Sequence, residues 1–139
     1  MTEWNLDNLK KKYFKLQEKY TLPIFEEINR DFQIEKVSEY ETDFILKEAR
    51  ECMTNKFLNY LRFIESLINP SNGPMFMLAI IKSLGAKEKE KLTELYKKIA
   101  KIDVDLIELD IEYSEEKEAE AIKKYYVMWQ EMKKEFLWI

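Results

Sequence analysis

The stretch IDVDLIELDIEY, residues 102 to 113, decides between two kinds of fold. Its apolar residues alternate with polar ones, which is typical of a half-buried strand. The same residues also continue an upstream apolar stripe at helical steps of three and four, through Leu95, Ile99, Ile102, Leu106, Leu109 and Tyr113. A strand would have to change faces between Leu106 and Ile107, whereas one helix accommodates the whole run. We therefore predict a helix, in which Ile107 and Ile111 widen the apolar stripe toward a second neighbouring helix.

Composition supports an all-α protein. The chain has 139 residues, of which 46% are hydrophobic and 36% are charged, with only two glycines and three prolines. This length is typical of one domain with its own core, so we treat residues 1–139 as a single helical domain. A β-rich fold would need many turns with glycine, proline or asparagine, whereas a few long helices need only a few connections.

Apolar spacing predicts a bundle of five or six helices. We expect a first helix from about Thr2 or Asn5 to Tyr20, and a second that starts near Thr21 or Leu22. Long amphipathic helices are predicted over about 38–69, 87–113 and 114–139, with Ser38 or Thr42 and Ser114 as caps. Between the first two of these, Pro74 and Gly85 frame a short apolar central helix, about 74–84.

The chain contains no histidine and one cysteine, Cys52. Serine or cysteine catalysis that depends on histidine, zinc sites built on histidine and internal disulfides are therefore excluded. The longest apolar run, Met75 to Ile81, is far shorter than the roughly 18 residues that span a bilayer. The first residues also lack the pattern of a secretory signal, so we expect a cytoplasmic protein with no membrane partner.

Carboxylates follow the decisive stretch. Asp105, Glu108 and Glu112 recur at steps of three and four, which places them on one side of a helix. Because like charges at this spacing repel, the pattern indicates a solvated surface, a basic partner or a bound cation.

A magnesium site is the alternative interpretation of these carboxylates. Glu48 and Glu51 on the third helix are predicted to supply a second carboxylate pair opposite Asp105, Glu108 and Glu112. The arrangement loosely resembles the paired Glu-x-x-Glu and Glu-x-x-Asp helices of the all-α nucleoside triphosphate pyrophosphohydrolases. The resemblance covers these five residues only, and its two acidic groups lie further apart in sequence than that family's pattern. It implies a magnesium-dependent hydrolase that acts on a phosphorylated small molecule.

Two further features of the sequence bear on binding surfaces. Lysines are numerous, but the chain has only three arginines, whereas base reading and bidentate phosphate contacts favour arginine. This composition does not predict nucleic-acid binding. At the other end of the chain, Phe136, Trp138 and Ile139 belong to an apolar run that cannot all face one core, which predicts an exposed contact surface.

The leading hypothesis is a non-catalytic helical interaction protein without a cofactor. It would act as a subunit, regulator or inhibitor of another protein, or as a homo-oligomer. Its predicted contact residues are Asp105, Glu108, Glu112, Phe136, Trp138 and Ile139.

Overall fold

The computed structural model describes residues 4–39, 41–68 and 82–136, and these ranges contain helices but no strands. The helical elements, in chain order, are α1 (Leu6–Tyr20), α2 (Phe25–Phe32), the 3-10 helix η1 (Ile34–Glu39), α3 (Ile45–Ile68), α5 (Ala86–Ile111) and α6 (Glu115–Phe136). The predicted all-α, single-domain bundle is confirmed. The helix predicted over residues 102 to 113 is confirmed as far as Ile111, where α5 ends, whereas Glu112 is extended.

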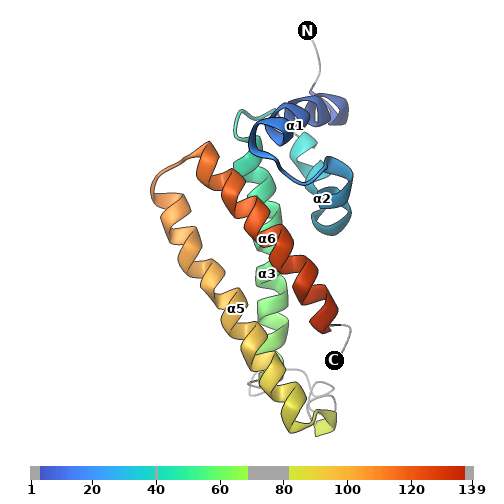
Figure 1. Ribbon diagram of the computed structural model, residues 1–139, viewed down its shortest axis with the longest axis vertical. Helices are drawn as coiled ribbons and strands as arrows, with labels where there is room; N and C mark the ends of the chain where they lie inside the picture. Colours follow the sequence, from blue (N-terminus) through green and yellow to red (C-terminus); the bar gives the residue numbers. More distant parts are fainter. Residues whose placement is uncertain (1–3, 40, 69–81, 137–139) are drawn as a thin grey trace.

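The three long helices form a bundle in which α5 runs antiparallel to α3 and α6 (Figure 1), and α3 packs against both of the others. Each helix turns one apolar stripe inward, and the stripes interlock in a common core. Fully buried members of this core include Met53, Phe57, Ile64, Leu95, Ile99, Ile102, Ile122 and Tyr125. Burial of a large apolar side chain contributes roughly 1.5–3 kcal/mol, so this shared core is the main source of stability.

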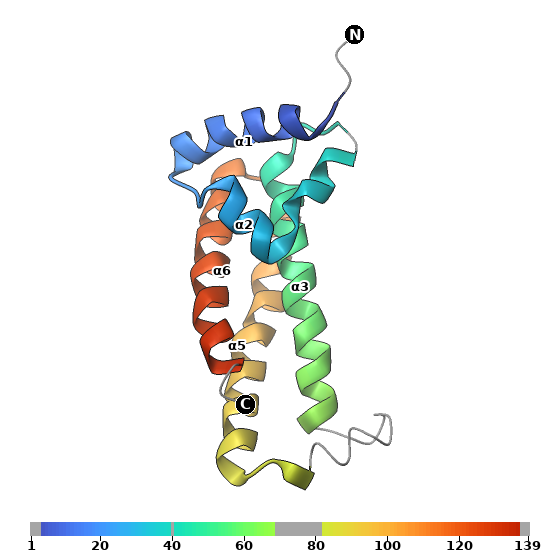
Figure 2. The same ribbon diagram turned by 90° about the vertical axis from the view of Figure 1, so that its right-hand side faces the viewer.

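The first helix lies across one end of the bundle (Figure 2). Asn5 caps α1 by accepting a hydrogen bond from the backbone of Asn8 at 3.0 Å. The buried Tyr13 donates its hydroxyl to the Pro23 carbonyl at 2.7 Å, which ties α1 to the segment after it. Tyr20 reaches α6, where its hydroxyl donates to Glu115 at 2.8 Å.

The segment between α1 and α3 differs from the prediction. Thr21 does not start the second helix but ends the first one, in the left-handed conformation with φ 56°. The helix α2 begins only at Phe25, and Gln33 ends it in the same left-handed conformation with φ 55°. Both ends are sharp turns without glycine, so no residue type marked them in the sequence.

The third helix also starts later than predicted. Ser38 belongs to η1, where its hydroxyl donates to the carbonyl of Glu35, so it does not cap α3. The helix begins at Ile45, after Thr42 has accepted a hydrogen bond from the backbone of Phe44.

The connection between α5 and α6 agrees with the prediction. The hydroxyl of Ser114 accepts a hydrogen bond from the backbone of Lys117 at 3.3 Å, in the first turn of α6. The central helix predicted at about 74–84 falls on residues 69–81 for most of its length, outside the described residues. Within the described ranges, no helix is long and apolar enough to cross a membrane.

Candidate functional site

The outer side of α5 carries a line of exposed apolar residues. Val104, Ile107 and Ile111 are 66, 62 and 79% exposed, and their spacing of three and four places them on one side of the helix. We call these three residues the α5 strip. The prediction that Ile107 and Ile111 widen the buried stripe was wrong, because α3 and α6 pack against the opposite side of α5.

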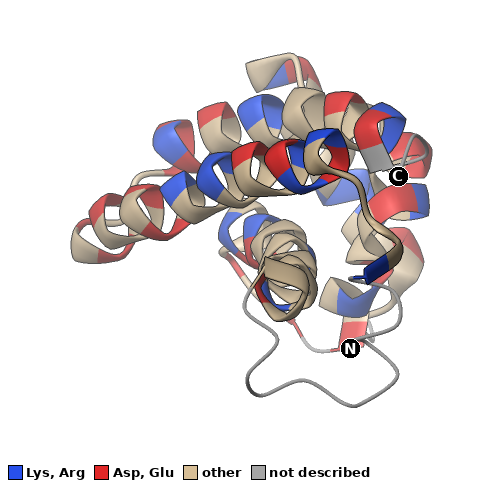
Figure 3. Cartoon of the chain, turned by 90° about the horizontal axis from the view of Figure 1, so that it is seen from below, with Lys and Arg blue, Asp and Glu red and all other residues tan. Residues whose placement is uncertain are grey.

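Carboxylates flank the α5 strip on both sides. By helical spacing, Asp103 and Asp110 lie along one edge and Glu108 lies along the other, and Glu112 follows directly after the last residue of the helix. Figure 3 shows acidic residues gathered at the end of α5 that joins α6, whereas acidic and basic residues alternate along the rest of the helix. Among the described residues, neither Asp103 nor Glu112 has an ion-pair partner. The strip is therefore an apolar surface bordered by carboxylates, of which Glu108 is paired with Lys117 and Asp110 with Arg50.

Two exposed aromatic residues add to the apolar surface at the end of α5 that joins α6. Tyr113 follows α5 and packs edge to face against Phe44, with ring centroids 4.9 Å apart. Both rings are more than one-third exposed. Apolar surface at this end of the bundle thus continues beyond the helix itself.

Of the three carboxylates predicted as contact residues, two face the same hollow between α5 and α6 and the third does not. Asp105 turns toward α6, where it pairs with Lys124 at 3.2 Å and accepts a hydrogen bond from Tyr125 at 3.5 Å. Glu108 lies 3.8 Å from Lys117 across the same hollow between α5 and α6, which has a volume of about 260 Å³. Glu112 ends the helix in an extended conformation and is exposed.

The five carboxylates of the magnesium hypothesis do not come together. No group of three or more acidic or cysteine side chains that could hold a metal occurs among the described residues. Glu51 is exposed, whereas Glu48 is half-buried on α3 and has one carboxylate oxygen without a hydrogen-bond partner. Trp138 and Ile139, predicted as part of a terminal contact surface, lie outside the described residues, and Phe136 is described only as the last residue of α6.

A buried ion pair that the sequence did not reveal joins α3 to α6. Arg50 is 2% exposed and Glu118 is fully buried, and their side chains make two hydrogen bonds of 2.7 and 3.1 Å. Asp110, at the end of α5, lies 3.7 Å from the same guanidinium. Burial acts to lower the pKa of Arg50, but Glu118 outweighs it, so the pKa is raised and the charge is retained. Arg50 thus links all three long helices.

A second candidate site is a groove on the side of α3 that faces α2 and η1. Five residues of α3 line it at helical steps: Cys52, Asn55, Lys56, Asn59 and Tyr60. This polar stripe runs beside the buried stripe of Met53 and Phe57, so it follows the one face of the helix that the bundle leaves uncovered. The same periodicity was available in the sequence, but nothing there showed which polar face would be hollow.

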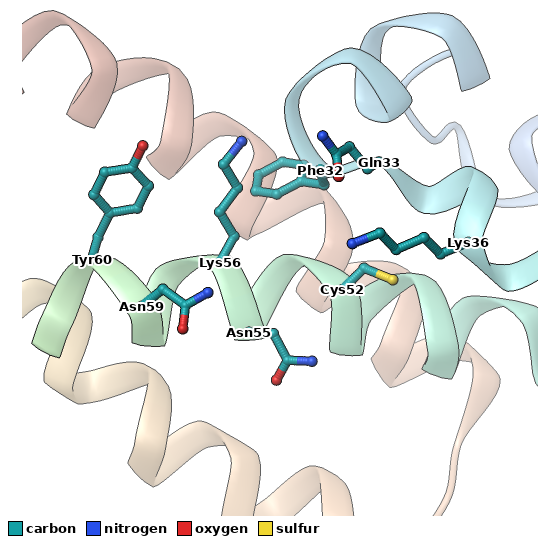
Figure 4. A pocket seen from close by; sticks show the side chains of 8 residues that line it. All are labelled: Phe32, Gln33, Lys36, Cys52, Asn55, Lys56, Asn59 and Tyr60. Carbon is teal, nitrogen blue, oxygen red and sulfur yellow. The ribbon is translucent and has the colours of Figure 1, made fainter.

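The opposite wall of this groove comes from the end of α2 and from η1. It consists of Phe32, Gln33 and Lys36. The left-handed conformation of Gln33 stops α2 and sends the chain directly into η1, and the Asn29 side chain fixes the turn by accepting from the backbone of Glu35 at 2.8 Å. Figure 4 shows the consequence, in which Lys36 reaches from η1 over α3 toward the space that Lys56 borders. We call this cavity, of about 440 Å³, the α3 groove.

Comparisons of the chain with protein-family models, with curated proteins and with solved structures found no match.

Proposed function

We propose that this protein is a non-catalytic interaction protein that binds a basic amphipathic helix of a partner protein along the α5 strip. Binding of this kind fits a subunit, regulator or inhibitor of that partner. The observation that carries the proposal is the alignment of Val104, Ile107 and Ile111 in the open on one helix face. Single exposed apolar residues are ordinary, but an aligned group beside further exposed rings is typical of a contact surface.

Helical spacing supports a helical partner. Amphipathic helices dock through anchors at steps of three, four and seven residues, and the α5 strip repeats that spacing. A partner helix laid along the strip would bury the three side chains and bring its own flanking residues over the carboxylates at both edges.

Charge decides between a different partner and a second copy of this chain. Asp103, Asp110, Glu108 and Glu112 frame the strip, so two copies meeting there would bring carboxylates against carboxylates. Lysines or arginines on the partner would instead pair with Asp103 and Glu112, which have no ion-pair partner among the described residues. A basic helix is thus the complementary occupant.

The test is titration of the full chain with a helical peptide that has leucines on one face and lysines on the other. We expect saturable binding by calorimetry that weakens with salt, and no binding of an analogue in which glutamates replace the lysines. The variant Ile107→Gln/Ile111→Gln should bind at least about tenfold more weakly, because a loss of about 1.4 kcal/mol corresponds to tenfold in affinity.

A matched control is Val127→Gln, since Val127 is an exposed apolar residue that belongs to α6 and not to the strip. It should leave binding unchanged. Asp103→Asn/Glu112→Gln should weaken binding at low salt and flatten its salt dependence. Equal binding of both peptides, or equal affinity of the strip variant and the Val127 control, would refute the proposal.

A further inference from the structure

The α3 groove has the size and composition of a small-molecule site. Its volume of about 440 Å³ falls within the range of roughly 300–1,000 Å³ typical of ligand pockets. The amides of Asn55 and Asn59, one helical turn apart on α3, offer both donors and acceptors to the cavity. These groups suit a polar molecule larger than a single ion.

The charged groups that line the groove are all cationic. Lys36 and Lys56 border it, and no carboxylate does. Among the described residues, no carboxylate lies within ion-pair distance of Lys36. The nearest acidic groups on α3 are Glu48 and Glu51, which act on Cys52 at one end of the groove.

Lys56 is held in place by groups that do not neutralise it. Its ammonium donates to the backbone carbonyl of Asp31, and it lies 5.8 Å from the ring centre of Phe32 and 5.1 Å from that of Trp129. An ammonium has three donors, so this arrangement leaves donors for a ligand.

The one buried carboxylate nearby is already engaged. Asp31 accepts hydrogen bonds from Gln130 at 2.7 Å and from Lys133 at 3.1 and 3.2 Å, both of which belong to α6. Its negative charge is therefore balanced on the α6 side and does not cancel that of Lys56. The groove keeps a net positive lining in a protein whose net charge is -4.

We propose that the α3 groove binds a phosphorylated small molecule, with its phosphate on Lys36 and Lys56 and its polar body against Asn55 and Asn59. Lysine binds phosphate as a point charge, whereas a flat carboxylate is better matched by the fork of arginine, and no arginine lines the groove. The site lies apart from the α5 strip, so this inference does not depend on the function proposed above.

The experiment is a two-dimensional amide NMR titration of the full chain, which reports the side-chain amides of Asn55 and Asn59 directly. The probes are glycerol 3-phosphate, ribose 5-phosphate and inorganic phosphate, with glycerol and ribose as unphosphorylated counterparts. We expect both phosphorylated probes to shift these amides in a saturable way, and the unphosphorylated probes to leave them unshifted.

The decisive variant is Lys36→Gln, because Lys36 is exposed and its loss removes a charge without opening the core. Charge-assisted hydrogen bonds contribute enough that this variant should weaken binding about tenfold or more. Lys123→Gln, which removes an exposed lysine of α6, should leave the affinity unchanged. Asn59→Asp should also weaken binding, because it adds a negative charge to the lining of a groove that binds an anion.

Three results would overturn the proposal. These are the absence of a saturable shift with either phosphorylated probe, equal affinity of the Lys36→Gln and Lys123→Gln variants, and saturation by inorganic phosphate as tightly as by the phosphorylated sugars. The last result would show a site for the ion alone.

Discussion

Arg50 Nε lies 2.7 Å from Oε2 of Glu118, and both side chains are buried between α3 and α6. The two atoms belong to residues 68 positions apart in the sequence, so the pair forms only when the bundle is assembled. A buried pair of this kind costs desolvation on both sides, and its value to the fold depends on both partners being present.

Removal of one partner should therefore cost more than removal of both. We expect Glu118→Gln to lower the free energy of unfolding by about 3–5 kcal/mol, because it leaves the buried Arg50 charge with only the exposed carboxylate of Asp110 nearby. The double variant Arg50→Met/Glu118→Leu should lose less than this single variant in urea unfolding. Lys98→Gln, which breaks an exposed pair with Glu135, is the control and should change stability by less than about 1 kcal/mol. A Glu118→Gln variant as stable as this control would contradict the argument.

Two phenylalanines of α3 provide a matched comparison of core and surface. Phe57 is fully buried and contacts the rings of Tyr125 and Trp129, with centroid distances of 6.0 and 5.4 Å, whereas Phe63 is 47% exposed. We expect Phe57→Ala to cost about 3–5 kcal/mol, since it leaves a cavity among aromatic side chains. Phe63→Ala should cost well under half as much in the same unfolding measurement. Similar losses in the two variants would show that Phe57 is not more deeply buried than Phe63.

Thr21 offers a stabilising substitution. It ends α1 in the left-handed conformation, with φ 56° and ψ 53°, which is unfavourable for a residue branched at Cβ. Glycine adopts this conformation without the steric cost, so Thr21→Gly should raise the free energy of unfolding by about 1 kcal/mol. Thr21→Ala retains Cβ and should gain little, which makes it the control. No difference between the glycine and alanine variants would argue against this backbone conformation.

The pH dependence of Cys52 reactivity should reflect the burial of its thiol and the charges near the α3 groove. Burial raises the pKa of its thiol, while the charge of Lys36 lowers it and Glu51 raises it. The neutral thiol is therefore favoured in the folded chain, and the rate of reaction with a disulfide reagent should rise at higher pH than in the urea-unfolded chain. Because the pKa of Cys52 is higher in the folded chain, its neutral thiol contributes to the free energy of unfolding. This contribution is fully present below the pKa of the unfolded chain and is lost as the pH rises through the pKa of the folded chain.

Variants separate the causes of this shift. Lys36→Gln should move the reactivity profile further upward in pH, because it removes the group that favours the thiolate. Lys123→Gln should leave the profile in place. Identical profiles for the folded and unfolded chains would contradict the burial of Cys52.

The sequence was sufficient to predict the long helices, because their buried residues recur with helical spacing over many turns. Ile99, Ile102 and Leu109 were correctly predicted to share one stripe, and all three are buried. Ile107 and Ile111 were assigned wrongly for a physical reason. An apolar residue beside a buried stripe has the same side chain whether it meets a neighbouring helix or solvent, and only the spacing of the helices decides between the two.

The short elements and the α3 groove were harder to predict. Thr21 and Gln33 turn the chain without a glycine or proline, and these turns set where Lys36 lies. The groove combines residues from three elements whose contact is tertiary, so its lining could not be recognised as one set. The ion pair between Arg50 and Glu118 was not predicted for the same reason, because in the sequence both residues resemble ordinary exposed members of charged helices.

The contacts between α6 and the first helices have a consequence for the order in which the chain can fold during synthesis. Tyr20 bonds to Glu115, and Asp31 bonds to Lys133, so residues about one hundred positions apart meet in the finished bundle. A nascent chain that ends before α6 lacks the Trp129 ring that packs against Phe32 and Phe57. The aromatic core must therefore stay open on the ribosome until α6 has emerged, so closure of the bundle follows the synthesis of α6.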